Sequence, residues 1–327
     1  MLMPEKSRKQ ETPMITVAMP TKNNSSTIQA VLKSLERQDY PKERMQIVFV
    51  DGLSRDGTYR KIVSWAERSK AQYSDILLIA EESNIPKARN ICLGNAKGDY
   101  VLFWDADVVA PPMATRTLLN DMKSLRVGIA NHPYYLDHPG LIDKVLKLDE
   151  PTNTAYVKAV VMGFTMIKKQ LLKKVGYFNE TLDGFEDQDF SHRVTRARFK
   201  ILIDPSVKLK HLRKPMGFGR FVKENFSRRS KYVNSLVSSG SRKQLLRAIY
   251  YLLLPLNFLI GVVTIEFVSW RTGTCLLILA LAYMIVSVMW HLRRAKKSSY
   301  GLLSPIVHLI GGIALAYGML WQAAKEK

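Results

Sequence analysis

The chain contains little cysteine. Cys92 and Cys275 are the only two in 327 residues, and they lie far apart in segments of different character. They can build neither a disulfide framework nor a cysteine-based zinc site. We therefore expect the soluble part of the chain to work in a reducing compartment.

Two other features are missing. Residues 1–13 are polar and charged, without the apolar stretch of a secretory signal, so we do not expect the N-terminal domain to be translocated. No glycine-rich phosphate loop of the G-x-G-x-x-G or Walker type occurs, which disfavours a dinucleotide dehydrogenase and a P-loop NTPase.

Acidic residues are scarce relative to basic ones. The chain has 28 Asp and Glu against 49 Lys and Arg, and its formal net charge is +21. Such an excess suggests a phosphate-rich partner or an anionic membrane surface.

Long apolar runs are confined to the C-terminal part, at residues 248–270, 273–292 and 302–321. Each run is close to the ~20 residues that a helix needs to cross a bilayer. Aromatic residues of the kind found at membrane interfaces flank them: Trp270, Trp290, Tyr300 and Trp321. We predict three transmembrane helices, with buried core helices as the alternative.

The charges of the connecting loops predict the orientation. Residues 293–299 are strongly basic, whereas the loop around Arg271 carries one charge. Because Lys and Arg favour the cytoplasmic side, we expect a multi-pass protein of the cell (cytoplasmic) membrane, with its N-terminal domain in the cytosol and its C-terminus outside. Glu266 lies near the outer end of the first run, where it either snorkels to the interface, which we favour, or has a function.

A basic segment precedes the first apolar run. Between Lys208 and Arg247 there are twelve Lys or Arg residues and one acid, Glu224. Within residues 214–247, apolar side chains recur at helical spacing beside basic ones, at Phe218, Phe221, Val222 and Phe226. We predict helices in the headgroup plane that bind anionic membrane lipids; a solvated basic face is the alternative, and nucleic acid is not expected as a partner.

Residues 14–213 alternate strand-like and helix-like segments, which predicts an α/β domain with a largely parallel sheet. The strands are expected at 15–19, 46–50, 76–80 and 100–104. Ser25 or Ser26 is expected to cap the first helix, and another helix is expected to begin near Thr58.

Polar residues follow these apolar strands, namely Thr21, Asn23, Asp51, Glu81, Asp105 and Asp107. Ligands of open α/β sheets bind at the carboxyl ends of the strands. An extended backbone would place the carboxylates of Asp105 and Asp107 on the same side. Mg²⁺ or Mn²⁺ takes such oxygen ligands and would neutralise a departing diphosphate.

Five motifs occur in order between residue 14 and about residue 213: Pro20-Thr21-Lys22-Asn23, residues 50–58, Ala88-Arg89-Asn90, residues 98–107, and Gly184-Phe185-Glu186-Asp187. In these motifs the chain resembles a family 2 glycosyltransferase with the GT-A (Rossmann-like) nucleotide-sugar-binding fold. The implied architecture is that domain, then the interfacial helices and the three transmembrane helices.

The resemblance also implies a donor site for a UDP- or GDP-sugar. Pro20, Thr21, Asn23 and Asp51 would contact the nucleotide, Arg89 would approach the donor, and Asp105 would hold ribose and metal. Asp107 would bind Mn²⁺ or Mg²⁺, and His211 would face the metal or the diphosphate. The alternative for Arg89 is an ordinary surface cation.

For the acceptor, the resemblance implies that Asp187 is the general base and Glu186 positions the acceptor. Inversion by a single displacement requires a base for the incoming hydroxyl. The favoured acceptor is therefore a hydroxyl of a lipid-linked saccharide or surface glycan. Polyprenyl phosphate, which needs no base, is the second possibility, and a non-catalytic membrane adaptor is a remote third. A processive synthase is disfavoured because no Gln-x-x-Arg-Trp sequence occurs.

Overall fold

The computed structural model describes residues 12–146, 152–182, 184–224, 226–227, 260, 270–294 and 310. They belong to two compact units. The first contains the described residues up to Tyr134, with Asn153–Phe178 and Arg193–Leu212. The second contains the rest. Each unit is described by itself.

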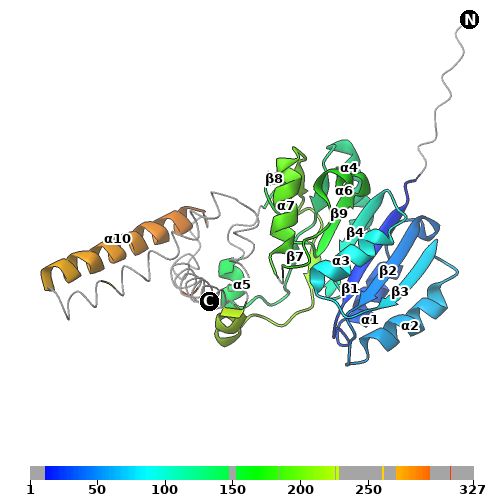
Figure 1. The fold of residues 1–327 in the computed structure, drawn as a ribbon, viewed down its shortest axis with the longest axis horizontal. Coiled ribbons are helices and arrows are strands. Elements are labelled where there is room, and N and C mark those ends of the chain that lie inside the picture. The colour runs from blue at the N-terminus through cyan, green and yellow to red at the C-terminus, as the bar shows by residue number, and fades with distance from the viewer. Residues whose placement is uncertain are drawn as a thin grey trace, which may run out of the picture. The chain divides into compact units, whose positions relative to one another are not determined.

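An eight-stranded sheet in the order β3-β2-β1-β4-β9-β6-β10-β8 forms the centre of the first unit (Figure 1). Its strands are β1 Ile15–Thr21, β2 Met45–Asp51, β3 Asp75–Ala80, β4 Tyr100–Trp104, β6 Ile129–Asn131, β8 Ala155–Val157, β9 Phe164–Lys168 and β10 Ile201–Ile203. The four strands expected from the sequence are confirmed.

The sheet is mixed rather than largely parallel. β1, β2, β3 and β4 pair in parallel, but β9 runs antiparallel between β4 and β6. This arrangement sets Tyr100, at the start of β4, opposite Lys168, at the end of β9. Parallel pairing is therefore confirmed for β1 to β4 and recurs between β6 and β10, whereas β9 and β8 run antiparallel to their neighbours.

Helices cover both faces of the N-terminal half of the sheet (Figure 1). α1 Ile28–Glu36, α2 Thr58–Ser69 and α4 Ala114–Ser124 share the main apolar core with alternate residues of β1, such as Ile15, Val17 and Met19. α3 Ile85–Gly94 packs against β1 and β2 on the other face, where the Cys92 thiol lies 3.8 Å from the Val48 carbonyl oxygen. Since both faces are covered, the strands are continuously apolar.

The expected cap of the first helix is wrong. Thr27, not Ser25 or Ser26, precedes α1, and its side chain makes no capping bond. The Thr27 hydroxyl instead donates to the carbonyl oxygen of Ala106, at 2.8 Å. The start of α1 thereby holds the Asp105–Asp107 turn.

A small second sheet, in the order β5-β11-β7, includes the residues that follow the Asp105–Asp107 turn. Its strands are β5 Val108–Val109, β11 Leu209–His211 and β7 Tyr134–Tyr135. Short helical elements complete the connections: η1 Lys42–Arg44, η2 Lys169–Leu171 and α6 Leu172–Val175. The pairing of His211 with Val108 fixes β11 beside the residues that follow β4.

In the second unit, α5 Leu141–Leu146 is fixed by the buried carboxylate of Asp143. That carboxylate accepts hydrogen bonds from Arg213 at 2.5 Å, Met216 N at 2.9 Å and Gly140 N at 3.0 Å. Burial alone would raise the pKa of Asp143, but these donors hold it below its usual range. The strand-to-helix connection after Leu212 is thus tied to α5.

Within the segment predicted to be interfacial, residues 218–224 are helical, as the spacing of the apolar residues indicated, and an ion pair of 2.7 Å joins Arg220 and Glu224. Phe218 is 59% exposed, whereas Phe221 is buried at 2%. Only part of the expected apolar face is therefore open to a membrane. The remainder of the basic segment up to residue 247 lies almost wholly outside the described residues.

α10 Trp270–Arg294 is a helix of 25 residues that includes the second predicted span, 273–292. Among the described residues, no helix is both long enough and apolar enough to cross a membrane. The predicted spans 248–270 and 302–321, and Glu266 within the first, lie outside the described residues apart from positions 260, 270 and 310.

Candidate active site

The carboxyl ends of β1 and β2 meet in a buried polar cluster. Thr21 lies opposite Asp51 in the parallel register, and its hydroxyl donates to Asp51 Oδ2 at 3.0 Å. Ser54 donates twice to the same carboxylate, from its backbone N–H and its hydroxyl, both at 2.7 Å. Asp51 is 1% exposed. Its carboxylate therefore holds the loop after β2 in place. The same carboxylate is one of the groups predicted to contact the nucleotide.

Asn23 connects this loop to the end of β1. It adopts a left-handed backbone conformation with φ of 55°, which Asn tolerates better than most residues. Its side chain accepts from Arg55 N at 3.0 Å, and its own N–H donates to the Ser54 hydroxyl at 2.8 Å. The half-buried Pro20, opposite Val50, precedes this turn. A hollow of about 430 Å³ beside the loop is lined by Arg55, Arg60 and Tyr59, among others.

The expectation that Asp105 and Asp107 lie on an extended strand is wrong. β4 ends at Trp104, and Val108 N donates to the Asp105 carbonyl oxygen at 3.1 Å, so the motif forms a turn. The indole of Trp104 also donates to the Val108 carbonyl oxygen, at 2.7 Å, which closes this turn. The two carboxylates consequently have different partners.

Asp107 faces His211. Asp107 Oδ2 lies 3.0 Å from His211 Nε2, and the pairing of β11 with β5 holds the two residues together. The Leu212 N–H adds a hydrogen bond of 2.8 Å to the Asp107 carbonyl oxygen. The His211 ring packs against the Tyr134 ring in a tilted arrangement, with ring centroids 4.4 Å apart and an interplanar angle of 57°. Among the described residues, its buried Nδ1 has no hydrogen-bond partner.

Asp105 faces Arg89 of α3. Arg89 Nη2 lies 4.0 Å from Asp105 Oδ1. The guanidinium lies over the rings of Phe178 and Phe103, at 5.5 and 5.9 Å from their centroids. Arg89 is only 5% exposed. The alternative of an ordinary surface cation is therefore wrong, and Arg89 is a buried cation at the end of β4.

Two residues of the site were missed from the sequence, Gly163 and Tyr134. The Gly163 carbonyl oxygen accepts from Asp105 N at 2.8 Å. A Cβ at Gly163 would lie 2.6 Å from Tyr134 Cε1 and 3.2 Å from Asp105 Oδ2. A side chain at this position would therefore push against Tyr134 where the chain enters β9, and the only sequence signal was a glycine before the mostly apolar residues 164–167. Glu81, another of the polar residues that follow the predicted strands, forms an ion pair with Lys87 at 2.8 Å.

Glu186 and Asp187 lie in the second unit, in the first turn of α7 Glu186–Arg196. Glu186 is buried at 6%, whereas Asp187 is half-buried. Asp187 Oδ1 accepts from Gln188 N at 2.8 Å. Acidic groups in a first turn interact favourably with the positive end of the helix dipole.

A second polar cluster was also missed: Asp121, His132 and Asp204. One potential ligand atom of each lies within 4.8 Å of the others. His132 Nδ1 lies 2.8 Å from the Asp204 carbonyl oxygen. Burial, together with the charge of Asp204, raises the pKa of Asp121 to about 6. Burial alone would raise the pKa of Asp204, but its hydrogen bonds to Ser206 and Thr154 lower it.

The donor set at the end of β4 suits a divalent cation. Carboxylate oxygens and one imidazole are ligands that Mn²⁺ accepts, and Mg²⁺ takes the oxygens. The unpartnered Nδ1 of His211 and the contact of its Nε2 with Asp107 fit this use. Asp105, Asp107 and His211 do not form one compact ligand group, because Asp105 turns to Arg89. The predicted residues thus lie at one edge of the sheet as two pairs, Asp107 with His211 and Asp105 with Arg89.

The sequence and the fold were compared with known proteins. Residues 16–176 match the family described as Glycosyl transferase family 2. The mannosyltransferase PcManGT from Pyrobaculum calidifontis, solved with GDP-Man and Mn²⁺, has a TM-score of 0.65 at 20% sequence identity, over 96% of this chain and 88% of that one. At this identity the likeness shows the fold.

Two curated proteins give further matches. Poly(ribitol-phosphate) beta-N-acetylglucosaminyltransferase TarS of Staphylococcus aureus is 34% identical over 92 residues, which cover 28% of this chain and 16% of TarS. Glycosyltransferase AglE of Haloferax volcanii is 22% identical over 220 residues, which cover 65% of this chain and 71% of AglE. The chain thus matches only a small part of TarS. Residues 16–176, just under half of the chain, thus match the glycosyl transferase family 2 model, and the fold is similar to that of PcManGT.

Proposed function

We propose that this protein is an inverting, metal-dependent glycosyltransferase that moves a sugar from a UDP- or GDP-sugar to a hydroxyl of a lipid-linked saccharide or surface glycan. The observation that carries the proposal is the pair of contacts at the end of β4, from Asp107 to His211 and from Asp105 to Arg89. Both contacts stand beside the polar cluster of Thr21 and Asp51.

Different residues of this site would bind different parts of the donor. The ends of β1 and β2 present polar groups to the base and ribose, which carry N–H and hydroxyl donors. Arg89 supplies positive charge near the diphosphate, and its burial makes that charge effective. Asp105, Asp107 and His211 would hold Mn²⁺ or Mg²⁺, which stabilises the negative charge of the leaving diphosphate.

In the transfer step, the acceptor oxygen forms a bond to the anomeric carbon while the bond from that carbon to the diphosphate oxygen breaks. The electron pair leaves with the nucleoside diphosphate. Asp187 takes the proton of the acceptor hydroxyl, and Glu186 orients the acceptor. These two roles follow from the motif Gly184-Phe185-Glu186-Asp187.

Membrane anchoring belongs to the same proposal. It is supported by the three apolar runs and the basic loop 293–299 of the sequence, and by the exposed apolar side chains of α10. Trp270, Leu279 and Val286 are 66%, 62% and 64% exposed. We place the catalytic domain in the cytosol, at a membrane rich in anionic lipids. Alkaline extraction tests the anchoring: the full chain should stay with the membranes, and release into the supernatant would contradict it.

The activity is tested with purified full chain, Mn²⁺ and a panel of donors. The panel includes GDP-mannose and UDP-N-acetylglucosamine, because the similar proteins include a mannosyltransferase solved with GDP-Man and an N-acetylglucosaminyltransferase. At least one donor should be hydrolysed slowly, and chelation should stop the reaction. If no donor is hydrolysed or bound, the non-catalytic adaptor becomes the better account.

The acceptor class is tested with Asp187→Asn, with the exposed Glu180→Gln as matched control. On a hydroxyl acceptor, Asp187→Asn should retain donor binding and lose transfer by about 10²-fold or more, whereas Glu180→Gln should transfer normally. Unchanged transfer by Asp187→Asn would point to polyprenyl phosphate, an acceptor that is already an anion.

A further inference from the structure

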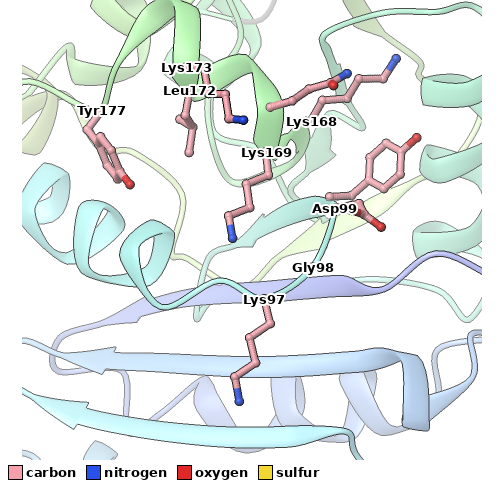
Figure 2. Close-up of a pocket in the computed structure, with 10 residues that line it drawn as sticks. Lys97, Gly98, Asp99, Lys168, Lys169, Leu172, Lys173 and Tyr177 are labelled. Atoms are coloured by element: carbon pink, nitrogen blue, oxygen red, sulfur yellow. The ribbon is translucent and has the colours of Figure 1, made fainter.

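A hollow of about 610 Å³ opens in the first unit at the start of β4 (Figure 2). It lies at the opposite end of the strands from the donor site, and it is larger than the hollow of about 430 Å³ beside the loop after β2. Its lining includes Lys97 and Gly98 before β4, Lys168 and Lys169 at the end of β9, and Lys173 and Tyr177 beyond it. Four of its ten lining residues are lysines and one, Asp99, is acidic. The hollow is therefore a basic pocket, which we call the lysine pocket.

Backbone contacts hold the two sides of the lysine pocket together. Lys169 N donates to the Asp99 carbonyl oxygen at 2.9 Å, and the antiparallel register sets Tyr100 opposite Lys168. Below them, Gly98 N donates to the Thr16 hydroxyl at 2.9 Å. A Cβ at Gly98 would lie 2.6 Å from Thr16 N, so only glycine allows this approach to β1. The pocket is thus fixed by the sheet and does not depend on a loop conformation.

The four ammonium groups are not equivalent. Lys97 is paired with Asp75 at 2.8 Å and points away from the pocket toward the neighbouring strands (Figure 2). Lys169 donates to the Ala96 carbonyl oxygen across the pocket. The ammonium groups of Lys168 and Lys173 form no ion pair or hydrogen bond to another described residue. Lys168 and Lys173 therefore add two positive charges to a lining whose one acidic residue is Asp99.

Such an arrangement favours a compact anion. Four lysines and one aspartate give the lining a net positive charge, which attracts an anion even though the Lys168 side chain extends away from those of Lys169 and Lys173 (Figure 2). A phosphate group offers several acceptor oxygens to the donors of lysine, and lysine binds phosphate as a point charge. The exposed ring of Tyr177 adds an apolar wall for the carbon part of a ligand.

The lysine pocket is separate from the donor site. It lies at the start of β4, whereas Asp105 follows the end of that strand. The five residues of β4 put the two sites roughly 17 Å apart, at about 3.3 Å per residue. An anion in the lysine pocket is thus not the diphosphate of the donor bound at Asp107 and His211.

We propose that the lysine pocket binds a phosphate-bearing group through Lys168, Lys169 and Lys173. The group can belong to a soluble phosphate compound or to the headgroup of an anionic lipid, and both present the same phosphate oxygens. The binding does not depend on the proposed transferase activity.

The soluble source is tested by calorimetric titration of the purified full chain with pyrophosphate. A chelator is present, because the donor site needs a metal to hold a diphosphate. Pyrophosphate should bind, and Lys168→Gln with Lys173→Gln should weaken the binding by about tenfold. The matched control is Lys33→Gln with Lys123→Gln, which removes two exposed lysines from α1 and α4 and should change the affinity little. Asp107→Asn should leave the affinity unchanged.

The lipid source is tested by flotation with phosphatidylcholine vesicles that contain or lack phosphatidylglycerol. If lipid is the ligand, the extra binding to phosphatidylglycerol should fall in the Lys168→Gln, Lys173→Gln variant and persist in the control variant. The proposal is overturned if the pocket variant and the control variant behave alike with both pyrophosphate and vesicles. It is also overturned if Asp107→Asn abolishes pyrophosphate binding, because the donor site would then be the site of binding.

Discussion

His211 Nε2 lies 3.0 Å from Asp107 Oδ2, although the two residues lie far apart in the sequence. The link between them is the pairing of β11 with β5, which sets His211 opposite Val108. A histidine held at a carboxylate in this way is pre-arranged to share a divalent cation with it. This pair is the structural basis for expecting a metal-dependent transferase.

The first prediction concerns His211. Replacing it by Gln removes an imidazole donor but keeps a polar side chain, so the Mn²⁺ concentration needed for half-maximal donor hydrolysis should rise by about tenfold or more. His138 is exposed and lies outside the site, and His138→Gln should leave that concentration unchanged. An equal response of the two variants would remove His211 from the metal site.

Arg89 provides the second prediction. Lys in its place keeps the charge but loses the planar group that lies over Phe103 and Phe178. Arg89→Lys should lower the free energy of unfolding by about 1–2 kcal/mol and raise the KM for the donor. Lys87→Arg on the same helix is the control, since Lys87 is only half-buried and pairs with Glu81. Urea denaturation measures the free energy of unfolding, and donor kinetics measure the KM. An unchanged KM would contradict the proposed contact between Arg89 and the donor.

The third prediction concerns Gly163. Its Cβ would displace Tyr134 or Asp105, since it would lie 2.6 Å from Tyr134 Cε1. Gly163→Ala should therefore reduce donor hydrolysis by about a hundredfold, as expected for a small misplacement of a catalytic-site group. Gly94→Ala is the control, because nothing lies within 4 Å of a Cβ there. Full activity of Gly163→Ala would show that the position of Asp105 is not critical.

The fourth prediction is a pH dependence from Asp121. Its pKa in the folded protein is about 6 because of burial and the nearby charge of Asp204, whereas an unfolded aspartate has a pKa of about 3.9. Between these values the folded protein binds a proton that the unfolded chain releases. The free energy of unfolding should therefore fall as the pH rises through this window, and the stabilisation by protonation is lost above about pH 6.

Asp121→Asn tests this pH dependence by denaturation at several pH values in the presence of a chelator. In this variant the free energy of unfolding should no longer fall as the pH rises. The difference in free energy of unfolding, variant minus natural chain, should therefore increase from pH 4.5 to pH 7. The exposed Asp137→Asn should keep the slope. A slope that persists in Asp121→Asn would show that another group titrates.

The sequence predicted the first half of the fold well. Continuous apolar strands such as residues 46–50 require a sheet covered on both faces, and β1 to β4 are found as expected. Because parallel strands end at one edge, Asp51 and Asp105 were correctly placed at a common edge. These predictions depended on local pattern and on the order of elements.

The remaining features depend on contacts between distant segments. β9 enters antiparallel beside β4, and its neighbour Gly163 binds Asp105 N. Thr27 holds the Ala106 carbonyl oxygen, which helps to make the aspartate motif a turn instead of an extended segment. Arg89 is buried because Phe103 and Phe178 come together around it. No local pattern in the sequence contains this information.

The central claim is that Asp105, Asp107 and His211 hold a metal–nucleotide complex. The most direct test is to titrate Mn²⁺ into the purified full chain with UDP or GDP present, and to measure free Mn²⁺ by electron paramagnetic resonance. The natural chain should bind about one Mn²⁺ more with one of the nucleotides than without it, and Asp107→Asn should lose this nucleotide-dependent binding. Binding that is unchanged in Asp107→Asn, or absent with both nucleotides, would contradict the account.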